Sequence, residues 1–315
     1  MENHINPDKI KSLTGIKVFA LLLIFYQHSS LPLLPFGLGS RMCELLMIIS
    51  GFLVGYNYYY KNVPCSWKES FRYCISKLIS IYPLYILITI IRCVIEYKSF
   101  NSVTTWIKLL LTIFMVQPWS PNQDVFFAFN GSSWFIICLL YSYFLSPLFL
   151  RLIHLKNNFC IFLLTIFIRV FLELIDVYSN VSFVEFSFHV NPFIRSLEFF
   201  LGMLLVPYFY NIKERIKNIS RVKRKIYFTF LEILILMLSI FYLTICLILY
   251  QKALTFDKCW VMNDIILKFI YIFICFILLI GICCVYRSIF KNIFTNLFIR
   301  MLRNIKIFFW GGEFV

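Results

Sequence analysis

Hydrophobic and polar positions along this chain alternate on the scale of whole membrane spans. Apolar runs long enough to cross a bilayer begin near residue 16 and are separated by short polar loops. Nine runs are found at 16–36, 43–60, 75–95, 102–118, 133–153, 158–177, 193–210, 226–250 and 264–286. A tenth begins near Ile293, and the sequence ends at Val315. The pattern predicts an all-α fold, a polytopic transmembrane helix bundle with about nine to ten spans.

Composition points to the same class. Hydrophobic residues make up 61% of the 315 positions, charged residues make up 14%, and the mean hydropathy is +0.83. Water-soluble globular domains do not have this balance. No internal repeat or low-complexity linker interrupts the sequence, so residues 1–315 are expected to form a single integral-membrane domain whose last span is incomplete.

The net charge of +15 comes from basic loops between the apolar runs. These loops lie at 61–77, 213–225 and 287–306, which is the distribution of cytoplasmic loops in a membrane protein and does not indicate nucleic-acid binding. The first basic loop follows two runs, so the N-terminus is expected in the cytoplasm. The eleven cysteines lie mostly within or beside the runs and predict neither a disulfide framework nor a metal site.

The loop charges conflict with the number of runs. Five runs separate the basic loops at 61–77 and 213–225, and an odd number would place these loops on opposite sides. Either one run does not cross the membrane or a further span is hidden. The run 102–118 is the weakest, because it is short and contains Lys108.

Lys17 and His28 share the first apolar run. They are eleven residues apart, close to three helical turns, so they lie on one helix face about 16 Å apart. If the helix enters the hydrocarbon near Ile16, His28 lies about 18 Å deep, about two-thirds of the way along the run. An ionisable side chain at that depth is costly and indicates function.

Glu44 opens the second run and lies seven residues before Gly51. Gly51 and Gly55 form a small-xxx-small pair that lets another helix approach closely, and Glu44 shares their face. Glu44 is expected at a depth that His28 can reach, where a carboxylate would orient the imidazole. A structural glutamate at the headgroup level is the alternative.

Arg72 and Lys77 precede the aromatic residues and Pro83 of the third run. They have two interpretations. Cations followed by an aromatic belt are ordinary anchors at a cytoplasmic helix start. The functional alternative is that both side chains bind an anionic cofactor through its phosphates.

Five stretches in this order resemble the acyltransferase-3 family of integral-membrane acyltransferases. They are LTGIK followed by His28, ELLMIISGFLVGY at 44–56, KLISIYPLY at 77–85, Ser133-Trp134-Phe135 with Tyr141 and Pro147, and Asn191-Pro192 with Arg195, Glu198 and Phe199. The resemblance covers most of the chain up to about residue 205.

The resemblance implies transfer of an acyl group, commonly acetyl from acetyl-CoA, to a hydroxyl of a cell-surface carbohydrate. By position, His28 takes the role of the essential histidine, and Lys17 stands where the family usually has arginine. Lys77 falls on the first position of the basic pair implied to hold the CoA phosphates. The second position is the neutral Ser80, which Arg72 is expected to offset.

Three further intramembrane groups have alternative interpretations. Arg195 and Glu198, at i and i+3, either neutralise each other structurally or line a pore. Arg169 and Glu173, at i and i+4, form a similar pair. Trp134, at the start of a run, is either an interfacial anchor or a substrate platform.

The leading hypothesis is a bacterial inner-membrane O-acyltransferase. In it His28 is the general base, Glu44 orients it, and Lys17, Arg72 and Lys77 attract the acyl-CoA donor; no metal is involved. The acceptor is a carbohydrate or glycolipid at the cell envelope. The rival is a carrier or flippase that makes no bond, with His28, Arg195 and Glu198 along its pathway. A third hypothesis is a degenerate, inactive family member, indicated by Ser80 and the short C-terminus.

Overall fold

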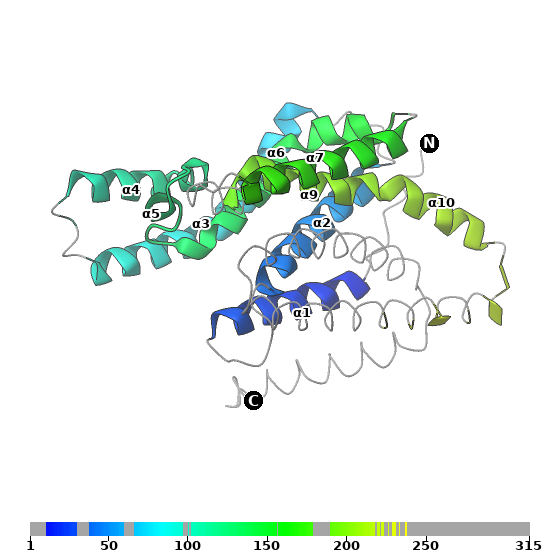
Figure 1. Cartoon of the computed structure of the whole chain (residues 1–315), viewed down its shortest axis with the longest axis horizontal. Coiled ribbons are helices and arrows are strands. Elements are labelled where there is room, and N and C mark those ends of the chain that lie inside the picture. Colours follow the sequence, from blue (N-terminus) through cyan, green and yellow to red (C-terminus); the bar gives the residue numbers. More distant parts are fainter. Residues whose placement is uncertain are drawn as a thin grey trace, which may run out of the picture. The chain divides into compact units, whose positions relative to one another are not determined.

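The computed structural model describes residues 11–29, 38–59, 66–96, 100, 102–155, 157–178 and 190–217, with isolated positions between 219 and 237. Every regular element in these residues is a helix (Figure 1). The helices belong to two compact units, residues 46–206 with 1–7 and residues 8–45 with 207–315. Each unit is described by itself. The runs predicted from residue 226 onward lie largely or wholly outside the described residues.

The helices follow the apolar runs closely. Residues 8–45 and 207–315 hold α1 (Lys11–His28), the start of α2 (Leu38–Tyr58) and most of α10 (Val206–Lys217). The other unit holds the rest of α2 and a longer series of helices. These are α3 (Trp67–Ile95), α4 (Val103–Ile113), η2 (Gln117–Trp119), α5 (Gln123–Phe126), η3 (Gly131–Ser133), α6 (Trp134–Ile153), α7 (Asn158–Tyr178) and α9 (Pro192–Leu204).

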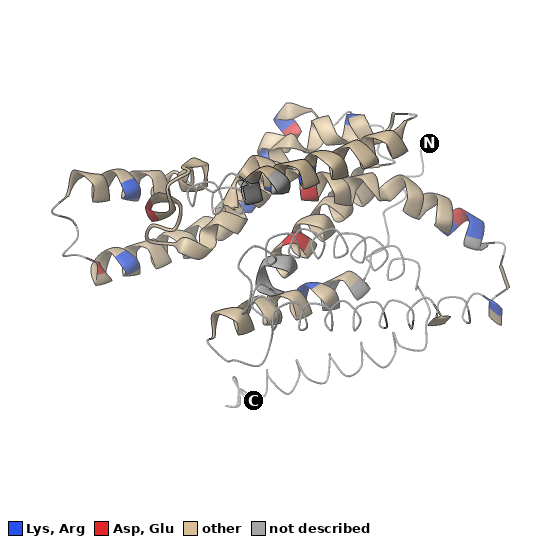
Figure 2. Ribbon diagram, viewed as in Figure 1, with Lys and Arg blue, Asp and Glu red and all other residues tan. Residues whose placement is uncertain are grey.

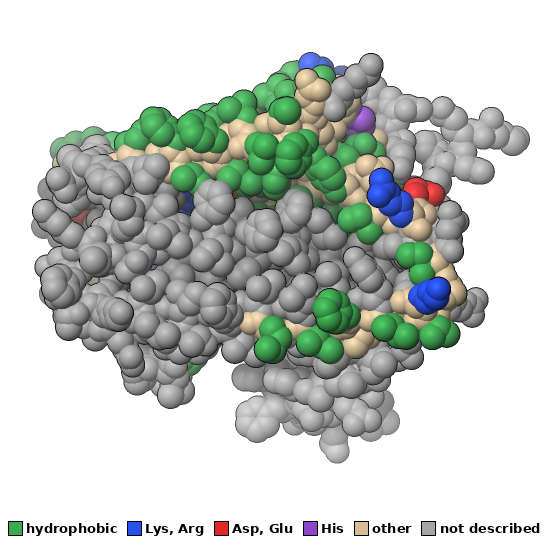
Figure 3. Space-filling view, turned by 45° about the vertical axis from the view of Figure 1, so that its right-hand side comes forward, with side chains coloured by type: hydrophobic (Ala, Val, Ile, Leu, Met, Phe, Trp, Pro, Cys, Tyr) green, Lys and Arg blue, Asp and Glu red, His purple; other side chains and the backbone are tan. Residues whose placement is uncertain are grey.

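Three described helical segments are long and apolar enough to cross a membrane, namely Trp67–Ile95, Gly131–Ile153 and Pro192–Arg215. Shorter apolar helices cover Ile16–His28, Met42–Tyr58, Val103–Ile113 and Asn158–Leu172. Charged positions are sparse along the ribbons (Figure 2), and the described surface in the space-filling view is largely hydrophobic (Figure 3). The prediction of a helical membrane protein is confirmed, whereas the total of nine to ten spans stays a prediction.

Pro147 fixes the contact between α3 and α6. A proline inside a helix has no N–H, so the carbonyl four residues earlier, that of Tyr143, loses its helical partner. Ser70 on α3 donates a hydrogen bond to this oxygen at 2.7 Å, and Ser146 donates another at 2.7 Å. Hydroxyl groups thus satisfy a backbone acceptor that water cannot reach inside a membrane.

Glycines bring α2 and α9 into backbone contact. A Cβ atom on Gly51 would lie 1.8 Å from the carbonyl oxygen of Phe199, and one on Gly202 would lie 2.0 Å from that of Ile48. One turn later, a Cβ on Gly55 would lie 2.9 Å from Cγ2 of Val206. The close-packing face predicted from Gly51 and Gly55 is therefore confirmed, with α9 as its partner.

The order of these contacts shows that α2 and α9 run in the same direction. Gly51 faces Phe199, and Gly55, one turn later on α2, faces Met203, one turn later on α9. The two helices therefore end on the same side of their unit. The C-terminal end of α6 lies on this side as well, because the His154 ring contacts the carbonyl oxygen of Tyr59 at 3.1 Å.

α4 is the shortest α-helix in the five predicted runs between the first two basic loops. The predicted run 102–118 contains a helix of only 11 residues, about 16 Å long, which is about half the thickness of the hydrocarbon core. Without it, four runs separate the first two basic loops, and an even number matches the parallel course of α2 and α9. That this side is the cytoplasmic one stays a prediction.

We expect Gly51→Ala to lower the free energy of unfolding by about 3 kcal/mol, the upper end for an overpacked core. The new methyl group would meet backbone atoms of Phe199, which move only if the whole helix moves. Gly55→Ala is the matched control, because its methyl group first meets a valine side chain and should cost less than half as much. Equal losses in detergent unfolding of the two purified variants would contradict the backbone contact.

Candidate functional site

Two arginines and one glutamate form a buried ionic cluster between α7 and α9. Glu198 Oε1 accepts hydrogen bonds from Arg169 Nε at 3.2 Å, Arg169 Nη2 at 3.1 Å and Arg195 Nη1 at 2.8 Å. Glu198 Oε2 accepts another from Arg195 Nη1 at 3.0 Å. Arg195 and Glu198 are each only 1% exposed, and Arg169 is also buried. The three charges therefore form one desolvated group.

Trp134, the first residue of α6, extends this cluster. The guanidinium of Arg195 lies 5.5 Å from the centre of the Trp134 ring, a cation–π contact. The tryptophan is 8% exposed. In the described part of the chain it is thus a packed side chain against a buried cation, not a tryptophan exposed as an interfacial anchor. The contact adds α6 to the two helices that the ion pairs join.

The hydrogen bonds limit what Glu198 can do chemically. A carboxylate that accepts four guanidinium hydrogen bonds has few lone pairs left for a substrate proton. Glu198 is therefore better suited to holding α7 and α9 together than to acid–base chemistry. Removing one partner of such a buried pair is costly, because the remaining charge stays desolvated.

The predicted pairing of Arg195 with Glu198 is confirmed, the predicted pairing of Arg169 with Glu173 stays a prediction, and Arg169 has a partner that the sequence did not indicate. Arg169 bonds to Glu198, 29 residues away on another helix. The side chain of Glu173 lies outside the described residues. The i, i+4 spacing indicated a local pair and gave no signal for the contact between helices.

Lys17 and His28 lie on one uninterrupted helix, α1. Lys17 is half-buried, and His28 is exposed. His28 is the last residue of α1, and the rest of the predicted run 16–36 beyond Ser29 lies outside the described residues. Both the N–H and the hydroxyl of Ser29 donate to the Tyr26 carbonyl oxygen, at 3.0 and 2.7 Å, a local turn that competes with a further helical turn.

Glu44 is buried in the second turn of α2, with 2% of its surface exposed. This burial does not fit a glutamate at the headgroup level, which would be hydrated. The pairing of Glu44 with His28 stays a prediction.

The first turns of α3 present the predicted donor-binding cations. Arg72 and Lys77 are exposed, and Lys77 Nζ lies 5.1 Å from the centre of the Tyr73 ring. Ser80 is exposed and donates its hydroxyl to the Ser76 carbonyl oxygen at 3.0 Å. A capping box between Ser66 and Glu69 starts the helix and so fixes where these cations lie. Their exposure is compatible both with anchoring and with binding an anion.

Gln117 is a buried polar residue that sequence reasoning missed. Its Nε2 donates to Ser133 Oγ at 2.8 Å and lies 3.3 Å from the Tyr85 hydroxyl oxygen. Tyr85 in turn donates to the Thr112 carbonyl oxygen at 2.5 Å. This network ties α3, the end of α4 and the start of α6 together. A glutamine directly before Pro118 in an apolar run was the available signal.

The described residues contain no group of three or more His, Cys, Asp or Glu side chains that could hold a metal ion.

One family of known proteins matches nearly the whole chain. Residues 10–305 match the family described as "Acyltransferase domain". Among curated proteins, Acyltransferase MdmB of Streptomyces mycarofaciens is 26% identical over 162 residues, a region that makes up 46% of this chain and 40% of that protein. The chain thus spans less than half the length of this curated relative. No solved structure matches.

Proposed function

Because this chain belongs to the acyltransferase-3 family, we propose that it is a membrane acyltransferase that transfers an acyl group from acyl-CoA to a hydroxyl of a cell-surface carbohydrate or glycolipid. Acetyl is the expected acyl group, and a bacterial inner membrane is the expected location. The family match over residues 10–305 carries this proposal. That range includes α1, the α3 cations and the buried ionic cluster.

In the proposed reaction His28 is the general base. As the acceptor oxygen attacks the thioester carbonyl, the imidazole takes the hydroxyl proton; the new ester C–O bond forms, the C–S bond breaks, and the proton passes to the departing CoA thiolate. The exposure of His28 at the end of α1 supports this role, because a base must be reachable by its substrate. Glu44 is proposed to orient the imidazole and stabilise its protonated form.

Cations are proposed to attract the donor. Acyl-CoA carries phosphates, and the exposed Arg72 and Lys77 offer charge-assisted hydrogen bonds to them. Lys17 is proposed to add positive charge on the His28 face of α1. The ionic cluster with Trp134 is proposed to hold α6, α7 and α9 in place as part of the substrate-binding region.

The burial of the ionic cluster gives the carrier hypothesis no support. Arg195 and Glu198 are in direct contact and almost fully buried, so neither lines an open pathway within the described part of the chain. An inactive family member remains the alternative that Ser80 suggests.

Membranes containing this protein, incubated with radiolabelled acetyl-CoA and a cell-surface carbohydrate fraction, test the proposed function. Covalent label in the carbohydrate supports the transferase. Movement of the carbohydrate across the membrane without covalent label supports the carrier instead, and neither signal supports an inactive member. Membranes from cells that lack the protein provide the background.

We expect the double change Arg72→Gln and Lys77→Gln to raise the KM for acyl-CoA at least about tenfold, with a smaller effect on the KM for the acceptor. Each charge-assisted hydrogen bond contributes roughly 1.5–3 kcal/mol, and about 1.4 kcal/mol is a factor of ten. The matched control is Lys68→Gln with Arg151→Gln, which removes two exposed cations from the same unit. An unchanged donor KM would leave Arg72 and Lys77 as membrane anchors.

A further inference from the structure

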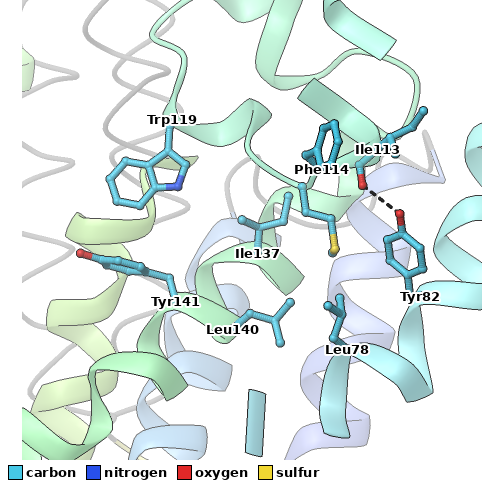
Figure 4. A pocket seen from close by; sticks show the side chains of 9 residues that line it. Leu78, Tyr82, Ile113, Phe114, Trp119, Ile137, Leu140 and Tyr141 are labelled. Carbon is cyan, nitrogen blue, oxygen red and sulfur yellow. Dashed lines mark hydrogen bonds between the residues drawn. The ribbon is translucent and has the colours of Figure 1, made fainter. Parts of the chain in front are cut away.

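An apolar cavity of about 390 Å³, wide open to the surface, lies between α3, the end of α4, η2 and α6 (Figure 4). Small-molecule sites commonly occupy roughly 300–1,000 Å³, so this space is large enough for a ligand segment. None of the nine side chains that line it is charged. Leu78 and Leu140 form one side, and Ile137 stands between them and Trp119 (Figure 4).

Polar contacts hold the wall formed by the end of α4. Tyr82, which lines the cavity, donates its hydroxyl to the Ile113 carbonyl oxygen at 3.1 Å (Figure 4). Met115 closes the wall with a φ of 57°, a left-handed conformation that is uncommon for a residue with a side chain. Gln117 and its hydrogen bonds lie directly after this turn. The cavity therefore has a wall that the fold maintains.

The backbone of this wall is unusual for a membrane protein. α4 is too short to cross, and the chain then turns through η2 before reaching α6. Irregular backbone within a membrane is tolerated only where it is buried in protein or lines a cavity. Trp119 packs edge-on against Tyr141, with ring centres 5.0 Å apart, two turns into α6. The irregular segment thus extends alongside a predicted spanning helix.

The neighbouring surface is hydrocarbon-like. Phe114, which lines the cavity, is 72% exposed, and Ile79 and Leu110 on the adjoining helices are also exposed. Such side chains face lipid when the helices span a membrane. A ligand that reaches the cavity across this surface arrives from the hydrocarbon, and neither a free polysaccharide nor the polyanionic CoA can do that.

We propose that this cavity binds the hydrocarbon anchor of a lipid-linked carbohydrate, so that the acceptor reaches the enzyme as a glycolipid and not as a free polysaccharide. This inference rests on the proposed function. The anchor would lie against Leu78, Ile137 and Leu140, and its binding would keep the sugar tethered beside the protein during transfer. The acetyl group of the donor is too small to need a cavity of this size.

Cross-linking with a photoactivatable glycolipid tests the binding. The probe is a hexadecyl glucoside with a diazirine near the end of its chain, added to the full-length protein in phosphatidylcholine vesicles. We expect label on the peptides of α6 that contain Ile137 and Leu140, reduced at least about fivefold in Leu140→Trp, which fills the cavity. Leu148→Trp is the matched control, since Leu148 is exposed on the same helix outside the cavity. Leu140→Phe, a smaller change, replaces Leu140→Trp if that variant does not fold.

Competition with unlabelled lipids shows which kind of lipid the cavity binds. Excess unlabelled hexadecyl glucoside should remove the label, and excess phosphatidylglycerol should not. Equal competition by the phospholipid, or equal labelling of Leu140→Trp and Leu148→Trp, would overturn the proposal, because the cavity would then hold ordinary bilayer lipid or nothing.

Transfer measured in the same vesicles separates this inference from the proposed function. Leu140→Trp should raise the KM for hexadecyl glucoside about tenfold and leave that for methyl glucoside unchanged. Equal KM values for both acceptors in the wild-type protein would overturn the inference while acyl transfer stands. Specific labelling without acyl transfer to any acceptor would instead remove the proposed function and retain the hydrocarbon site.

Discussion

Replacing His28 with alanine is expected to lower the rate of acyl transfer by about 10²–10⁴-fold while the protein still reaches the membrane. General bases contribute factors of this size, and the exposed position at the end of α1 means that truncation removes little packing. The measurement is radiolabelled acetyl transfer at equal amounts of membrane-inserted protein. His4→Ala is the matched control, because it removes a histidine from the polar N-terminal segment.

The same assay addresses the proposed partner of His28. Glu44→Gln keeps the size of the side chain but removes the charge that would stabilise an imidazolium, so transfer should slow. Combining it with His28→Ala should add little to the single change, since residues that act as one unit are not additive. Activity of His28→Ala within twofold of wild type would exclude the histidine as the base. Full activity of Glu44→Gln would leave that glutamate with a structural role.

Glu198→Ala is expected to lower the free energy of unfolding by about 3–5 kcal/mol, the cost of breaking a buried ion pair by removing one partner. It removes the carboxylate that Arg169 and Arg195 share across α7 and α9. The matched control is Glu96→Ala, which breaks the largely exposed pair of Arg92 and Glu96 on α3. Exposed pairs contribute about 0.2–1 kcal/mol, so the control should change stability little.

Denaturant unfolding of the two purified variants in detergent makes this comparison. Similar losses would mean that the cluster contributes no more than a surface pair. Glu198→Gln separates charge from shape, because the amide still accepts hydrogen bonds through its oxygen. An intermediate loss for this variant is the expected result.

Local patterns made part of this structure predictable. The apolar runs predicted helices, and the spacing of Gly51 and Gly55 predicted a close-packing face, because both signals depend on residues less than two turns apart. The i, i+3 spacing of Arg195 and Glu198 predicted their ion pair for the same reason.

Contacts between distant segments were not predictable in this way. Nothing in the spacing of Arg169 indicates Glu198, and nothing beside Gln117 indicates that Ser133 and Tyr85 bind it. The end of α1 at His28 falls inside the apolar run 16–36, where hydropathy alone does not mark a helix end.

The glycine contact between α2 and α9 also bears on how the protein is made. Gly51 and Gly202 are 151 residues apart, and a ribosome needs roughly 8–30 s to translate that distance. During this interval the glycine face of α2 has been synthesised and its partner has not. The backbone contact is therefore a late step of biogenesis, and the growing chain must protect this face of α2 until the translocon releases α9.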